Sequence, residues 1–96
     1  MTSQEDKRQH IRLDFNQLVR VEPYEGDTLH LIGINYSING IALNSPKPLP
    51  LGEFVDLKFR INNDTKQVHS MTAEVIQNQR HSNTYITGLK FVGELN

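Results

Sequence analysis

Two short clusters of polar residues carry the groups that could bind a ligand in this chain. Arg8 and Arg12 lie four positions apart in an R-x-x-x-R pattern, which includes His10 and follows Lys7. A guanidinium group is a planar set of donors that fits phosphate oxygens and the O6/N7 edge of guanine, and its flat face stacks on bases. The spacing alone is a weak indication, because arginine pairs are common on solvated segments.

The second cluster is an N-x-S-x-x-G pattern over residues 35–40. In an extended strand Asn35 and Ser37 point the same way, so an amide and a hydroxyl lie side by side and can hydrogen-bond a purine edge. Gly40 would leave the backbone open to a bulky ligand. The plainer interpretation is a polar strand end that runs into a two-residue Asn39-Gly40 hairpin turn, where both residues tolerate a positive φ.

Catalytic and metal-binding patterns are missing from the sequence. There is no cysteine, which excludes disulfides, Cys-ligated zinc and thiol catalysis. The histidines do not have the spacing of metal ligands, and Ser37 has no evident base beside it in the sequence. The histidines are His10, His30, His69 and His81. We therefore expect a protein that is not an enzyme and that holds no metal or cofactor, with His10 and Lys7 as secondary candidates for ligand contact.

Apolar residues alternate with polar ones through most of the chain, which predicts strands. We expect strands over residues 13–21, 28–38, 41–43, 54–61, 68–77 and 85–92, with a proline-rich loop over 44–50 and a polar loop over 79–83. Val55, Leu57 and Phe59 should face inward on the fourth strand. No segment has a helical stripe. Six strands separated by turns predict an all-β fold, and an antiparallel barrel is favoured because it leaves no exposed edge.

The second predicted strand has two faces of different character. Its apolar face should comprise Ile32, Ile34, Tyr36 and Ile38. Asn35 and Ser37 would then point outward together with Leu29 and Leu31. Two outward leucines need a cover, which the N-terminal segment, a ligand or a partner could supply.

Length and charge limit the class of protein further. Ninety-six residues fit one domain, and a net charge of −1 does not suit a protein that binds long nucleic acid. The apolar runs are too short to span a bilayer, and the first residues are polar, unlike a signal peptide. These features favour a cytoplasmic protein without membrane insertion, and a monomer is the default for a barrel of this size.

The two clusters, in this order, resemble the motifs of PilZ domains, and the strand Phe54–Leu57 and the closing segment Thr87–Phe91 agree with that family. The resemblance covers roughly residues 7–91. It implies a six-stranded antiparallel β-barrel over residues 13–92, a flexible arm over 1–12 and a tail over 93–96, with little or no C-terminal helix.

The resemblance also implies a ligand, the bacterial second messenger cyclic di-GMP. Arg8 and Arg12 would hold its guanine and phosphate groups, Asn35 and Ser37 would hydrogen-bond a guanine, and Gly40 would give room. The expected function is a receptor that changes conformation on binding and signals to a protein partner in motility, biofilm or virulence control. The alternative is a PilZ-like interaction module that binds no nucleotide. A barrel for single-stranded nucleic acid is disfavoured, because aromatic residues are few.

Overall fold

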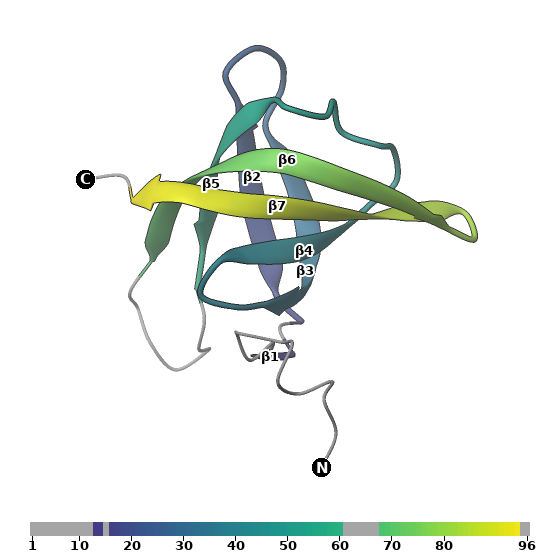
Figure 1. Cartoon of the computed structure of the whole chain (residues 1–96), viewed down its shortest axis with the longest axis horizontal. Helices are drawn as coiled ribbons and strands as arrows, with labels where there is room; N and C mark the ends of the chain where they lie inside the picture. Colours follow the sequence, from purple (N-terminus) through teal and green to yellow (C-terminus); the bar gives the residue numbers. More distant parts are fainter. Residues whose placement is uncertain (1–12, 15, 61–67, 95–96) are drawn as a thin grey trace, which may run out of the picture.

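The computed structural model describes residues 13–14, 16–60 and 68–94, which form strands, turns and loops. No helix long and apolar enough to cross a membrane occurs among them. The strands are β1 (Leu13–Asp14), β2 (Leu18–Pro23), β3 (Leu29–Tyr36), β4 (Gly40–Ser45), β5 (Phe54–Phe59), β6 (His69–His81) and β7 (Thr84–Glu94). Figure 1 shows them wrapped into a barrel, with β6 and β7 passing in front of β2.

The strands pair in the order β1-β3-β2-β5-β6-β7-β4, and a further pairing of β3 with β4 closes the ring. Every neighbouring pair is antiparallel. The predicted six-stranded antiparallel barrel is therefore confirmed. The predicted first strand over residues 13–21 is divided in the structure. Its first two residues form β1, which pairs with the end of β3 and places Asp14 opposite Asn35, and β2 begins only at Leu18.

The barrel interior is filled by alternate residues of each strand. On β5, Val55, Leu57 and Phe59 are buried while Phe54 is exposed, which confirms the predicted inward face. Fully burying an aliphatic or aromatic side chain contributes about 1.5–3 kcal/mol, so a core of this kind supplies most of the driving force for closure. The core comprises Val19, Val21, Leu31, Ile41, Leu43, Val55, Leu57, Phe59, Ala73, Val75 and Leu89.

The predicted faces of the second strand are wrong over its first half and again at its end, where Ile38 is exposed and Ser37 is buried. Leu31 is 6% exposed and Leu29 packs against the core, whereas Ile32 is 43% exposed. The cause over the first half is a β-bulge between Gly33 and Asn35, which adds one residue to β3 relative to β4. An extra residue shifts the alternation by one position. Odd-numbered residues therefore face the core before the bulge, and the alternation is reversed after it.

The turn between β3 and β4 also differs from the prediction. Ser37 N donates to Gly40 O at 2.9 Å, so the two residues between them, Ile38 and Asn39, form the turn. Neither Asn39 nor Gly40 has a positive φ. The hairpin is present, but its turn lies one residue earlier than expected and uses ordinary backbone angles.

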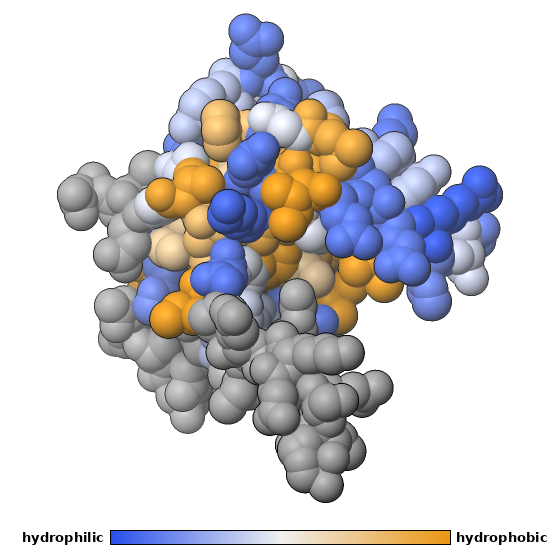
Figure 2. Space-filling model, viewed as in Figure 1, coloured by the Kyte–Doolittle hydropathy of each residue, from blue (hydrophilic) through white to orange (hydrophobic). Residues whose placement is uncertain are grey.

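The hairpin of β6 and β7 extends through the segment predicted to be a polar loop. Its strands stay paired as far as His81 and Thr84, and only Ser82 and Asn83 make the turn, with Ser82 at φ 58°. Gln79, Arg80 and His81 are exposed. The ribbon projects beyond the barrel (Figure 1), and Figure 2 shows its tip in the blue of hydrophilic residues. Its composition therefore resembled that of a loop.

The proline-rich segment after β4 lies along β6. The amide side chain of Asn78 donates to Leu49 O at 2.7 Å, and its oxygen accepts from Leu49 N at 3.1 Å. The same oxygen accepts a hydrogen bond from the buried Thr87 hydroxyl at 2.7 Å. Further along, Gly52 N donates to Val75 O and Val75 N donates to Glu53 O. The loop therefore takes the place of a strand beside this part of β6.

Candidate functional site

Three of the residues expected to bind a ligand lie along one hollow on the outside of the barrel. Asn35, Ser37 and Gly40 line a trough of about 460 Å³ on the wall formed by the end of β3, β4, β7 and β6. A volume of a few hundred Å³ is usual for small-molecule sites. In this part of the chain, the N-x-S-x-x-G pattern therefore lies where a ligand could be held.

The floor of the trough is made of small residues from neighbouring strands. Asn35 pairs with Ala42, Ala42 pairs with Gly88, and Gly88 pairs with Gln77, so these four form one row across the wall. A Cβ at Gly88 would meet only the Gln77 Cβ, at 3.7 Å. The hollow exists because Ala42 and Gly88 extend almost no side chain into it. A flat ring could therefore approach the sheet backbone closely.

Longer side chains from β6 and β7 line the remaining sides of the trough. They include Ile76, Gln79, Ile86 and Lys90. Lys90 pairs with Gly40 and is exposed, so its ammonium group can reach an anion in the trough. The sequence analysis did not single out these residues. Alternation placed them on strands, but only the pairing of β4, β7 and β6 brings them next to Asn35.

Ser37 is held at the edge of the trough by backbone hydrogen bonds. Its side chain is nearly buried, with the residue 8% exposed, and its Oγ accepts from Asn39 N at 3.3 Å. Phe91 N donates to Asn39 O at 2.8 Å, which ties the turn to β7. A hydroxyl that accepts one hydrogen bond still has its proton to donate. Ser37 is thus a positioned donor at the turn.

Gly40 is required for a reason that the sequence did not reveal. A Cβ at this position would collide with the Leu89 carbonyl oxygen, and it would lie 3.2 Å from the Leu89 carbon and 3.3 Å from Lys90 Cα. The atoms in the way belong to backbone and cannot rotate aside. The expectation that this glycine serves the turn by a positive φ is wrong. A glycine is needed here because β4 and β7 approach too closely to leave space for a side chain.

The two arginines and their neighbours lie outside the described residues. This applies to Arg8, Arg12, Lys7 and His10, so their place relative to the trough stays a prediction. Within the described ranges, no group of three or more His, Cys, Asp or Glu residues could hold a metal ion.

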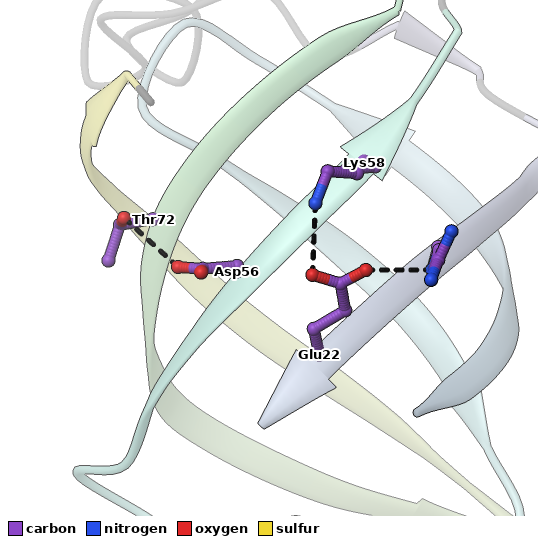
Figure 3. A network of polar contacts seen from close by, with 5 residues as sticks. Glu22, Asp56, Lys58 and Thr72 are labelled. Atoms are coloured by element: carbon purple, nitrogen blue, oxygen red, sulfur yellow. Dashed lines mark hydrogen bonds and ion pairs between the residues drawn. The ribbon is translucent and has the colours of Figure 1, made fainter. Parts of the chain in front are cut away.

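A second polar cluster lies on the far wall of the barrel, on β2 and β5. Glu22 accepts from Lys58 Nζ at 2.9 Å and pairs with Arg20 Nε at 2.7 Å. Figure 3 shows Glu22 and Lys58 facing one another across the two strands, with Asp56 and Thr72 beside them. The hydrogen bond from Lys58, with the charges of Lys58 and Arg20, lowers the pKa of Glu22 below its ordinary value.

Comparison with solved structures shows the same fold in other proteins. The inhibitor of motility of Bacillus subtilis (MotI/DgrA) matches with a TM-score of 0.77 and 22% identity, over 92% of this chain and 44% of that chain. The PilZ domain of YcgR from Escherichia coli, in a structure with c-di-GMP, matches with a TM-score of 0.69 and 16% identity, over 90% of this chain and 78% of that chain. This chain thus spans less than half the length of the Bacillus subtilis chain.

A structure of YcgR in complex with c-di-GMP, also from Escherichia coli, matches with a TM-score of 0.67 and 15% identity, over 90% of this chain and 38% of that chain. No curated protein sequence matches this chain. The family model of the PilZ domain matches residues 6–96, which is nearly the whole chain. Together with the closed antiparallel barrel, this match shows that the chain belongs to the PilZ domain family.

Proposed function

We propose that this chain is a cyclic di-GMP receptor whose nucleotide lies in the trough on the β3–β4–β7–β6 wall. The observation that carries the proposal is the meeting of Asn35, Ser37 and Gly40 along one hollow floored by Ala42 and Gly88. Family membership supports the choice of ligand, and so do the neighbouring structures that contain c-di-GMP.

The chemistry of the trough suits a guanine base. The Ser37 hydroxyl and the Asn35 amide provide hydrogen-bonding groups on one side, and the glycine and alanine floor accepts a flat ring. Lys90 adds one positive charge for a phosphate. Arg8 and Arg12 complete the site in this proposal, through charge-assisted hydrogen bonds and stacking on the bases.

In this proposal the protein acts as a switch and not as an enzyme. Binding brings Arg8 and Arg12 onto the nucleotide, and the reshaped surface then engages a protein partner. Motility, biofilm formation or virulence control would be the process served. We place the receptor in the cytoplasm, as a monomer that needs no cofactor besides its ligand.

The substitution that tests the trough most cleanly is Gly88→Val. Valine favours strands and its Cβ finds room at this position, so the barrel should stay folded. Its methyl groups would fill the floor, and calorimetric titration should show at least tenfold weaker binding of cyclic di-GMP. Gly93→Val is the matched control, because Gly93 lies on the same strand in open space and does not line the trough.

The arginines are tested in the same titration. Arg8→Ala and Arg12→Ala should each weaken binding by about 1.5–3 kcal/mol, the scale of hydrogen bonds to charged groups. The stoichiometry of the wild type will distinguish one bound nucleotide from an intercalated pair. A folded wild-type protein that gives no heat would favour the alternative, an interaction module without nucleotide. Normal binding by Gly88→Val would place the nucleotide elsewhere.

A further inference from the structure

The outer face of β3, β2 and β5 carries side chains in three rows of different chemistry. Leu18 pairs with Ile32, Arg20 pairs with both His30 and Lys58, and Glu22 pairs with Asp56. Val19 and Val21 between them are fully buried, so Leu18, Arg20 and Glu22 share the outward face. The face therefore has an apolar row, then a basic row, then an acidic row.

This face is hollowed where the apolar and basic rows meet. A groove of about 630 Å³, named here the basic groove, is lined by Leu18, Arg20, His30, Lys58, Arg60 and Val68, among others. Leu18 is 56% exposed and Val68 is 46% exposed. Ile32, beside Leu18, is 43% exposed. A single small anion would leave most of this groove empty, and it would make no favourable contact with the exposed apolar side chains of Leu18 and Val68.

Positive charge is concentrated in the basic groove. The described residues contain six Lys and Arg residues, of which Arg20, Lys58 and Arg60 line it, while Lys47, Arg80 and Lys90 do not. Glu22 pairs with Arg20 through Nε at 2.7 Å, and the Arg20 side chain is half exposed. A guanidinium group has five N–H donors, so Arg20 has donors for a second anion. Both cations are thus held in place by Glu22 and still present donors outward.

We propose that the basic groove docks an acidic protein segment that carries an aliphatic residue. Its carboxylates would lie along the row of Arg20 and Lys58, and the aliphatic side chain would cover Leu18 and Val68. Side chains two residues apart on a strand are about 7 Å apart, so one short segment, extended or helical, can contact both rows.

The arrangement favours a protein segment over a nucleic acid or a lipid surface. A polyanion binds through many phosphates, whereas the described residues that line this groove include three cations, and the Glu22 carboxylate lies between two of them.

The basic groove is also separate from the trough, and the two share no lining residue. In the closed ring, β2 and β5 lie opposite β7 and β4, so a partner and a nucleotide could bind together.

The test uses synthetic peptides of about twelve residues and the whole chain. One peptide has Glu and Leu residues separated by Ser, a second has every Leu replaced by Ser, and a third has every Glu replaced by Lys. Amide chemical shifts are recorded by NMR during titration. The Glu/Leu peptide should shift the amides of residues 16–20 and 58–60 and leave those of the trough unchanged. The other two peptides should bind at least tenfold more weakly.

Two double variants with the same change of net charge provide the control. Arg20→Glu/Arg60→Glu should weaken the Glu/Leu peptide at least tenfold, and Lys47→Glu/Arg80→Glu should bind it like the wild type. Dispersed amide spectra will establish that each variant is folded, independently of nucleotide binding. Absence of shifts at the basic groove in millimolar peptide overturns the proposal. So does equal or tighter binding of a DNA oligonucleotide or of vesicles containing phosphatidylglycerol.

Discussion

The two opposite walls of this barrel are built from the same alternating strands, yet they present very different surfaces. On the β3–β4–β7–β6 wall the outward positions include Ala42 and Gly88, and the backbone lies at the bottom of a trough. On the β3–β2–β5 wall the outward positions carry Arg20, Lys58 and Glu22, which pair above the sheet. The shape of the first wall depends on how closely its strands approach one another, and the chemistry of the second wall depends on the charged side chains at its surface. Substitutions should therefore be costly at the closest strand contact of the first wall, at Gly40, and tolerated among the surface charges of the second.

Gly40→Ala should have the largest effect, because even a single methyl group collides with the backbone of Leu89. We expect a loss of about 3 kcal/mol in the free energy of unfolding, the upper end for overpacked sites. The same change at Gly88, where the added methyl finds room, should be neutral or slightly stabilising. Urea unfolding of both variants measures the difference. Equal stabilities would mean that β4 and β7 can move apart at Gly40, and the contrast between these two glycines would be lost.

Asn78→Ala should have an intermediate effect at the edge of the same wall. The substitution removes both hydrogen bonds to Leu49 and leaves the buried Thr87 hydroxyl without its acceptor. An unpaired buried polar group costs about 1–3 kcal/mol, so we expect a loss of about 2 kcal/mol in thermal or urea unfolding. Gln79→Ala, the exposed neighbour, is the control and should change stability by less than about 0.5 kcal/mol. A small effect of Asn78→Ala would show that the proline-rich loop holds its place without the amide.

Glu22→Gln should have the smallest effect, on the far wall. The folded protein lowers the pKa of Glu22, so the carboxylate stabilises the fold at neutral pH, and this contribution disappears as the pH falls through the lowered pKa. The variant should have a slightly lower Tm than the wild type at neutral pH, and the two should converge in acid. Added salt should also reduce the gap. An equal gap at both pH values would mean that Glu22 acts through packing and not through its charge.

The parts of the fold that depend on local alternation could be predicted from the sequence. Val55, Leu57 and Phe59 alternate with polar residues, and their burial followed directly. The β3 bulge was not predicted, because the extra residue is defined by the pairing of β3 with β4. The one local sign, Gly33 inside the apolar strand, marks either a bulge or a close backbone approach and does not distinguish them. The faces assigned to Leu31 and Ile32 were wrong for that reason.

The candidate site was predictable to a similar extent. The N-x-S-x-x-G pattern identified Asn35, Ser37 and Gly40, which the structure brings together along the trough. The floor and the far side were not identified, since Ala42, Gly88 and Lys90 come next to Asn35 only through strand pairing. The basic groove was missed for the same reason, because Arg20 and Lys58 are distant in sequence and adjacent in register.

The loop that Asn78 ties to β6 has a consequence for how this protein behaves in concentrated solution. An unpaired strand edge is a template on which another chain can add a strand and begin aggregation. Here the segment 49–53 lies along β6. A new strand would need backbone N–H groups to pair with, and this loop lacks them at its three prolines, Pro46, Pro48 and Pro50. The loop thus ends the hydrogen-bonding surface of the barrel at this edge, and a protein with Asn78 intact should resist intermolecular β-pairing.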